Sequence, residues 1–341
     1  MPSARVVALL GSGALRLHIG GGSTPGERGS GYSLATADNH IEPDEIYVLG
    51  TSHVSAQSAE DVQMVIDELT PDCVVLELCR SRSGLLYADD DAAARDRGRS
   101  LFGISGDGGP LQALLRSLSL GGWQAMMLRV GLVRVSSKVG LQAGVLPGAD
   151  LRAARRAALG MNSTLVLGDR PLEITLERCW DALPTAERWV LLRLGWFALR
   201  GGVRGEASTA DVDEGVTALV DRAVDDASAL QGLEAVLAER LPSLVKPLVT
   251  ERDVYLSLSM RSSLAVSGKR RVLGVVGRGH VDGVMDALAR PDEHRGAFKQ
   301  LTWTPRRAAA KRKLLGVIPE PLAKRLLLDG ALGLALWTAI C

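Results

Sequence analysis

The chain has 341 residues, of which 46% are hydrophobic, and its 40 Lys and Arg against 39 Asp and Glu leave a formal net charge of +1. A chain of this length can bury a large core, as one big domain or as two. The balanced charge gives no electrostatic footprint for nucleic acid, so we expect no nucleic-acid partner. Four scattered cysteines without a Cys-x-x-Cys pair argue against a disulfide framework or a zinc site and are typical of a reducing compartment.

Residues 1–41 differ in composition from the rest of the chain. They are rich in Gly, Ser, Ala and Arg, and the first acidic residue is Glu27. Arg5 and Arg16 stand in an otherwise apolar, acid-free stretch, a pattern that resembles an organelle transit peptide. We therefore predict a flexible leader over 1–41, with the folded part beginning near Glu42.

Four short apolar runs, rich in β-branched residues and bounded by Gly or Pro, are typical of strands buried in a parallel sheet. They are Glu45–Gly50, Cys73–Leu76, Thr164–Gly168 and Val272–Gly277. The sequence therefore predicts an α/β fold with a central, largely parallel sheet.

The segment between the first two runs has the pattern of a capped helix. A capping-box-like start lies at Ser58–Asp61, apolar residues follow at helical spacing, and Thr70-Pro71-Asp72 ends the pattern. Strand, helix, turn and strand together make a βαβ unit. We therefore expect the first two strands to be parallel neighbours.

Long helical patterns separate the remaining strands, at about 110–160 and 172–265. We predict that they are helical insertions within one domain over 42–304, and one of them could form a lid over the site. Residues 305–341 form a basic and then apolar C-terminal tail. Two interpretations of this tail stay open: peripheral contact with an anionic membrane surface, or a solvated basic face followed by a packed helix.

Chemically capable side chains follow each of the four runs. They are His53, Glu77, Asp169 with Arg170, and His280. In open α/β sheets the ligand crevice lies beyond the carboxyl ends of the strands, so we expect these residues to converge at one edge. His53 and His280 each end a Gly-x-x-His motif, and a neutral imidazole there suits a metal ligand or a general base. This duplication is the strongest internal sign of an active site.

His53 and Glu77 also have structural interpretations. His53 could simply cap the following helix. Glu77 interrupts an apolar run and must offset its desolvation, which a buried salt bridge to Arg80, Arg82 or Arg252 would do. Alternatively, its strand-end position places it in the catalytic machinery, where burial or a bound ion would decide its protonation.

Asp169 and Arg170 also allow two interpretations. Asp169 is a candidate metal ligand, and Arg170 is a candidate clamp for an anionic group or a developing oxyanion. An Asp–Arg pair that caps the next helix explains the same residues equally well. Taken alone, Asp253 has the pattern of an ordinary ion-pair member, and Cys79 that of a small buried thiol.

Taken together and in order, the motifs resemble those of the TraB/PrgY family, which is related to the Tiki and GumN proteins. The resemblance covers roughly residues 42–290. It depends on Tyr47–Ser55, Pro71–Cys79 with Arg82, Leu167–Leu176, Glu251–Asp253 and Val275–Val281.

The resemblance implies an α/β fold with inserted helices and a site that pairs two Gly-x-x-His motifs with a Glu and an Arg. Those roles carry over to His53, His280, Glu77 and Arg252. Members close to Tiki are described as metal-dependent proteases that use manganese or cobalt. TraB/PrgY members are linked to peptide-pheromone shutdown or, in eukaryotes, to mitochondria and organelle membranes.

The leading hypothesis is a metal-dependent hydrolase that acts on a peptide or a similar small-molecule substrate, with manganese or cobalt as the expected cofactor. The ion would polarise a carbonyl and activate water, and an arginine would stabilise the oxyanion. A metal-independent variant with His as the base stays open. The expected catalytic residues are His53, Glu77, His280, Arg252 and Arg170, and the expected metal ligands are His53, His280, Glu77 and Asp169.

The competing hypothesis is a non-catalytic scaffold or tether that keeps the pocket for a ligand. It depends on the basic stretch Arg306–Lys313 and on the leader. Under either hypothesis the expected location is intracellular, in a mitochondrion or chloroplast or at an organelle membrane surface.

Overall fold

The computed structural model describes residues 3–19, 43–52, 55–87, 148–185, 187–188, 242–267, 271–294, 296–303, 313–314 and 318–319. In chain order its elements are α1 (Ala4–Gly11), β1 (Leu15–Ile19), β2 (Glu45–Thr51), α2 (Ala56–Leu69), β3 (Cys73–Leu76), the 3₁₀ helix η1 (Arg80–Tyr87), α5 (Ala149–Gly160), β4 (Thr164–Leu167), α6 (Leu172–Ala182), α10 (Pro242–Val245), the π-helix η3 (Lys246–Thr250), α11 (Glu251–Ser267), β5 (Arg271–Gly277), the 3₁₀ helix η4 (Arg278–His280), α12 (Val281–Ala289), the 3₁₀ helix η5 (Pro291–His294), α13 (Ala297–Thr302), β6 (Lys313–Leu314) and β7 (Ile318–Pro319).

The central sheet has the strand order β1-β2-β5-β3-β4. Strands β2, β5, β3 and β4 run parallel to one another, and β1 is antiparallel to β2 at one edge. The four predicted apolar runs are the four parallel strands, and their ends differ by at most one residue from the predicted ends. The predicted α/β fold with a largely parallel sheet is therefore confirmed.

The first two predicted strands are parallel, but they are not neighbours. Strand β5 lies between β2 and β3, with Gly274 opposite both Val48 and Val75. A Cβ atom at Gly274 would collide with the side chain of Met260 in α11, so the glycine makes room for that helix. The expectation of adjacency is wrong because a βαβ pattern sets the direction of two strands and leaves open which strand inserts between them.

Part of the predicted leader is folded. Residues 4–19 form α1 and β1, with Val6 and Leu15 buried. Arg5 pairs with Asp61 of α2 (Nη2–Oδ1 2.6 Å), and Arg16 pairs with Asp282 of α12 (Nη2–Oδ1 2.7 Å). The prediction of a flexible leader is therefore wrong for this part, since the arginines that suggested a transit peptide form ion pairs. The rest of the predicted leader lies outside the described residues.

Helix α2 begins two residues before the predicted start. The Ser58 hydroxyl, expected in the cap, instead accepts a hydrogen bond from the backbone N–H of Ser52 (3.0 Å), the residue that follows β2. The helix ends as predicted, because Thr70 takes a left-handed conformation with φ 45° before Pro71.

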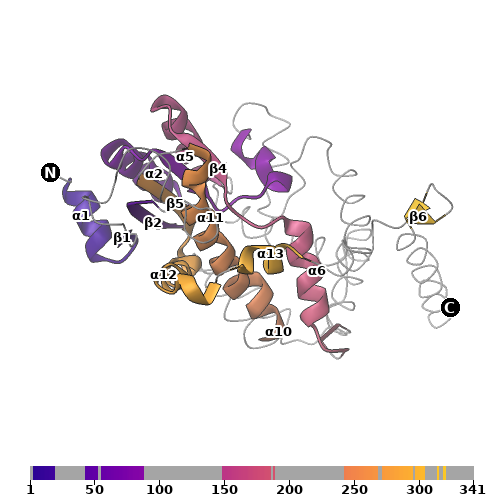
Figure 1. The fold of residues 1–341 in the computed structure, drawn as a ribbon. Coiled ribbons are helices and arrows are strands. Elements are labelled where there is room, and N and C mark those ends of the chain that lie inside the picture. Colours follow the sequence, from indigo (N-terminus) through magenta and orange to yellow (C-terminus); the bar gives the residue numbers. More distant parts are fainter. Residues whose placement is uncertain are drawn as a thin grey trace, which may run out of the picture.

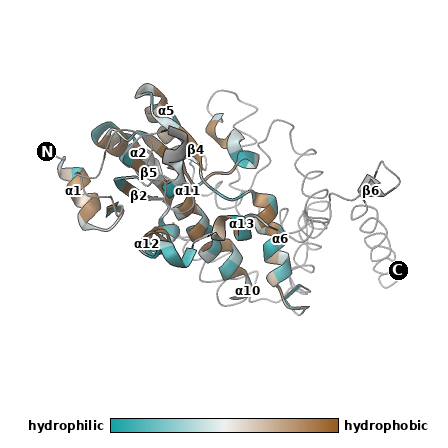
Figure 2. Cartoon of the chain, viewed as in Figure 1, coloured by the Kyte–Doolittle hydropathy of each residue, from teal (hydrophilic) through white to brown (hydrophobic). Residues whose placement is uncertain are grey.

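Helices cover both faces of the sheet (Figure 1). On one face, α2 and α5 pack against strand residues such as Val74, Leu76 and Val275. On the other face, α11 and α12 pack against residues such as Val75 and Val276. Figure 2 shows hydrophobic and hydrophilic residues interspersed along α6 and α11, and both helices bury polar as well as apolar side chains, such as Glu173 and Ser257.

The predicted insertions are helical where they are described. Helix α5 lies in the first insertion, and α6, α10, η3 and most of α11 lie in the second. Most of both insertions lies outside the described residues, as does most of the tail at 305–341, of which β6 and β7 are described. Within the described ranges, no helix combines the length and the apolar character needed to cross a membrane.

The Gly50→Ala variant tests the packing that fixes the sheet on α12. A Cβ atom at Gly50 would lie 2.6 Å from Val281 Cγ2 and 3.4 Å from the backbone Cα of Arg278. Because Val281 is buried and β-branched, we expect a loss of about 1–3 kcal/mol in the free energy of unfolding, measured by urea denaturation. Gly160→Ala is the control, since nothing lies within 4 Å of that added methyl group. Equal stability of the two variants would contradict this close approach.

Candidate active site

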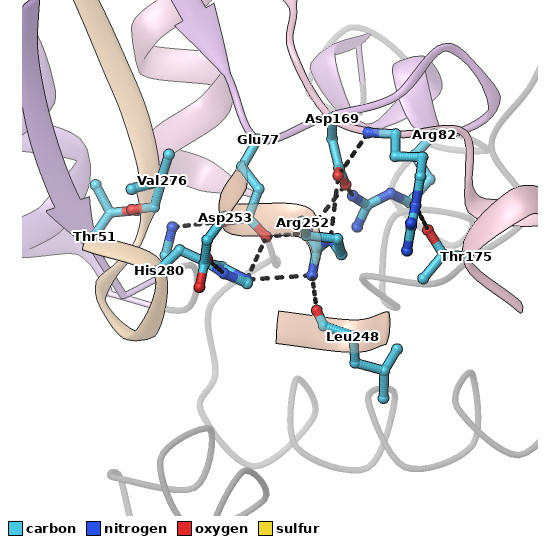
Figure 3. Close-up of polar contacts among 12 residues, drawn as sticks. Thr51, Glu77, Arg82, Asp169, Thr175, Leu248, Arg252, Asp253, Val276 and His280 are labelled. Carbon is cyan, nitrogen blue, oxygen red and sulfur yellow. Dashed lines mark hydrogen bonds and ion pairs between the residues drawn. The ribbon is translucent and has the colours of Figure 1, made fainter. Parts of the chain in front are cut away.

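The carboxyl ends of three parallel strands and the first turn of α11 meet at one place (Figure 3). Glu77 directly follows β3, Asp169 follows β4 after one glycine, and His280 lies in η4 directly after β5. Arg252 and Asp253 come from the start of α11. All but Arg252 are among the buried polar residues, and the guanidinium of Arg252 is itself largely covered.

Arg252 lies between Asp169 on one side and Glu77 and His280 on the other (Figure 3). Its Nε and Nη2 donate to both oxygens of Asp169 (3.1 and 3.0 Å), and Nη2 also donates to Glu77 Oε1. Arg82 Nη2 donates to Asp169 as well (2.6 Å). Burial alone would raise the pKa of Asp169, but Arg252 and Arg82 outweigh it and hold that pKa below its usual value. The two carboxylates therefore share one buried guanidinium.

Glu77 joins the ends of two strands. Its Oε2 accepts a hydrogen bond from the backbone N–H of Gly277 (2.6 Å), and its Oε1 lies 3.3 Å from His280 Nε2. The salt bridge considered from the sequence is present, and its partner is Arg252. Glu77 thus combines the ion pair of the structural interpretation with a position beside the imidazole, which keeps it a candidate catalytic residue.

His280 is held from both sides of its ring. Nδ1 lies 2.6 Å from Asp253 Oδ1, while Nε2 faces Glu77 and lies 3.2 Å from Arg252 Nη1. Burial would lower the pKa of His280, but Glu77 and Asp253 outweigh burial and the nearby guanidinium and raise it to about 9. Nε2 can accept a hydrogen bond from Arg252 only when it carries no proton, and it can donate one to Glu77 only when it does. The two contacts of Nε2 therefore compete. Burial raises the pKa of Asp253, and its contact with His280 opposes that rise.

A glycine makes room for the Asp253–His280 contact. Gly283 lies in α12, and a Cβ atom there would collide with Asp253 Oδ2. Asp253, which alone resembled an ordinary ion-pair residue, therefore orients the imidazole of His280. The sequence offered two signals for it: Asp253 follows directly on Arg252, and a glycine follows His280 within one turn of helix.

Arg170 lies behind this cluster, with its three nitrogens on other partners. Nε donates to Thr175 Oγ1 (3.0 Å), Nη1 to Glu251 Oε2 (2.7 Å) and Nη2 to the carbonyl of Pro247 (2.7 Å). Glu251 also accepts two hydrogen bonds from Arg178. Arg170 thus anchors the residue that precedes Arg252 instead of facing His280.

The π-helix η3 directly before α11 supplies acceptors to both arginines. The carbonyl of Pro247 accepts from Arg170, and that of Leu248 accepts from Arg252 Nη1 (3.3 Å). A π-helix departs from the regular pattern of backbone hydrogen bonds and is common at functional sites. This turn was not predicted, since the sequence shows there only a proline within a helical pattern.

The sequence analysis also weighed His53 and Cys79. His53 lies outside the described residues. Cys79 is buried, with its Sγ 3.2 Å from Ser81 Oγ. Thr51, close to His53 in the sequence, has its hydroxyl 2.5 Å from Asp150 Oδ2 of α5, a buried carboxylate that sequence reasoning missed.

The donors available for a metal ion can be tested against its geometry. Two ligands about 2.1 Å from an ion, at a tetrahedral angle, lie about 3.4 Å apart. The 3.3 Å between His280 Nε2 and Glu77 Oε1 fits this spacing, and the Asp253 contact at Nδ1 is the usual support of a ligating imidazole. Within the described part of the chain, however, no group of three His, Cys, Asp or Glu side chains could hold an ion. The pair therefore fits as two ligands of a site that needs another donor.

The raised pKa of His280 predicts how stability depends on pH. Because the pKa is about 9 in the folded chain and 6.5 ordinarily, the protonated ring stabilises the fold fully below pH 6.5, and this contribution is lost as pH rises through 9. The total loss should be about 3 kcal/mol. Urea unfolding of the wild type and of His280→Gln between pH 6 and 10 should give curves that converge as pH rises. Parallel curves would contradict the raised pKa.

Arg170→Met tests the support behind the site. Removing one partner of a buried ion pair leaves Glu251 with Arg178 alone, so we expect a loss of about 3 kcal/mol in the free energy of unfolding. Arg290→Met is the matched control, because the ion pairs of Arg290 with Asp286 and Glu293 are exposed and should contribute less than about 1 kcal/mol. A loss no larger than that of the control would show that Arg170 does not anchor α11.

The chain is similar in sequence to known proteins of one family. The model of the TraB/PrgY/gumN family matches residues 37–294. The TraB domain-containing protein of Homo sapiens is 30% identical over 256 residues, which are 70% of this chain and 61% of that protein. An uncharacterised protein of Methanocaldococcus jannaschii is 25% identical over 252 residues, 74% of this chain and 55% of that protein. The chain thus spans less than two thirds of the length of these relatives. It belongs to the TraB/PrgY/gumN family.

Proposed function

We propose that this TraB-family chain is a metal-dependent hydrolase that cleaves a peptide or a similar small substrate at the His280–Glu77 pair. The observation that carries the proposal is the chain of contacts Asp253–His280–Glu77. Asp253 holds Nδ1 at 2.6 Å, which directs Nε2 toward Glu77 Oε1 at 3.3 Å. A carboxylate that orients an imidazole toward a second carboxylate is an arrangement suited to ligating an ion or moving a proton.

Manganese or cobalt is the proposed cofactor. His280 Nε2 and Glu77 Oε1 would hold the ion, and His53, the residue in the matching Gly-x-x-His motif, is the expected third ligand. Asp169 is the weaker candidate, since both its oxygens accept hydrogen bonds from arginines. A bound divalent ion would supply Lewis acidity, polarising a carbonyl and lowering the pKa of water.

The chain's own residues have separable tasks in this proposal. Asp253 accepts a hydrogen bond from the Nδ1–H group of His280 and thereby keeps the lone pair of Nε2 directed at the site. Glu77 accepts a proton from the attacking water if it is not itself a ligand. Arg252, whose guanidinium borders the site, can donate to a developing oxyanion. Because the cluster is buried, these charges act in a low-dielectric surrounding that strengthens them.

His280→Ala and Glu77→Gln test the proposal directly. Each should lower kcat/KM for Mn²⁺-stimulated cleavage of a fluorogenic peptide library by about 100-fold or more, because each removes a ligand or a proton acceptor. Bound manganese, measured by elemental analysis of the purified protein, should fall in both variants. His294→Ala is the control, since His294 lies in η5 at the surface.

Activity should rise as pH approaches about 9, where His280 loses its proton.

Equal metal content and equal background hydrolysis in wild type and variants would overturn the proposal. The non-catalytic scaffold would then be the better hypothesis. Metal-independent cleavage that is lost in His280→Ala would instead show that His280 acts as a base without an ion.

A further inference from the structure

The guanidinium of Arg252 contacts each described side chain that is a candidate metal ligand: Glu77, Asp169 and His280. Resting on the proposed function, we propose that Arg252 is a built-in cation that closes the Glu77–His280 pair in the metal-free protein. A divalent ion then enters by displacing this guanidinium from Glu77 and His280.

The contacts of His280 support direct competition. The Nε2 atom of an imidazole has one lone pair. That lone pair is used if the nitrogen carries a proton toward Glu77, and it is equally used if it accepts from Arg252 Nη1 at 3.2 Å. An ion can bind Nε2 only after the nitrogen loses that proton or, in the neutral ring, after Arg252 Nη1 moves away.

The contacts of Glu77 lead to the same conclusion. Arg252 Nη2 donates to Oε1, the oxygen that faces His280. The second oxygen, Oε2, accepts from the backbone N–H of Gly277, so the end of β5 holds it in place. The oxygen best placed to share an ion with His280 is therefore the one that Arg252 occupies.

Electrostatic repulsion would drive the displacement of the guanidinium by the ion. A divalent ion at Glu77 and His280 would place two positive charges beside the buried guanidinium, and like charges repel strongly at such separations. Arg252 has a second partner ready, because its Nε and Nη2 already donate to both oxygens of Asp169. The guanidinium can therefore give up Glu77 and His280 while it keeps a paired carboxylate.

The test is Mn²⁺ binding, followed by the electron paramagnetic resonance signal of free Mn²⁺, in the wild type and in Arg252→Gln. Without the competing cation, the variant should bind Mn²⁺ roughly tenfold or more tightly than the wild type. Saturating Mn²⁺ should also raise the Tm of the variant more than that of the wild type. Arg271→Gln is the matched control, since Arg271 pairs with Glu45 at the opposite end of the sheet and should leave both readouts unchanged.

The outcomes separate this inference from the proposed function. Equal or weaker Mn²⁺ binding by Arg252→Gln would overturn the inference and make Arg252 a positioning residue, while the metal-dependent hydrolase would stand. Absence of Mn²⁺ binding in both proteins would overturn both. If Arg252→Gln does not fold, Arg252→Lys decides: it keeps the charge but cannot bridge three partners, so its affinity should exceed that of the wild type, and an unchanged affinity would overturn the inference.

Discussion

The rest of the site depends on the ion pairs that the buried guanidinium of Arg252 forms with Glu77 and Asp169. Glu77 and Asp169 follow different strands, and each must offset the cost of leaving water. Arg252 contributes to this for both, and Arg82 also pairs with Asp169, so the ends of β3 and β4 are tied to the first turn of α11. The Leu248 carbonyl and the Arg170–Glu251 pair hold the start of α11, the helix that carries Arg252.

The bounds of the parallel strands could be predicted closely, because strands that are buried on both faces have continuous apolar sequences. Their order could not, since β5 comes from a distant part of the chain and no local pattern states which strands pair with it. Strand β1 was missed for another reason. It is five residues long, of which Leu15 alone is buried, and Arg16 and His18 interrupt its apolar residues, so it lacks the continuous apolar run of the central strands.

The site residues differ in the same way, because some could be predicted from the sequence and others could not. Glu77 and His280 stood out because a polar residue at the end of an apolar strand needs an explanation, and the parallel register brings such residues together. Asp253 did not stand out. Its role depends on the contact with His280 and on the space left by Gly283 in another helix, and both are tertiary features. A sequence pattern therefore indicates which strand ends carry candidate site residues more readily than it indicates which helix supplies the remaining ones.

The two carboxylates that share Arg252 are not equivalent. Asp169 accepts four hydrogen bonds, two from Arg252, one from Arg82 and one from the backbone of Arg170. If Arg252 moved, Asp169 would keep charged and backbone partners. Glu77 has the backbone of Gly277 on one oxygen and Arg252 on the other, beside the imidazole of His280. In the proposed metal-dependent hydrolase, the fixed role would therefore fall to Asp169 and the changing one to Glu77.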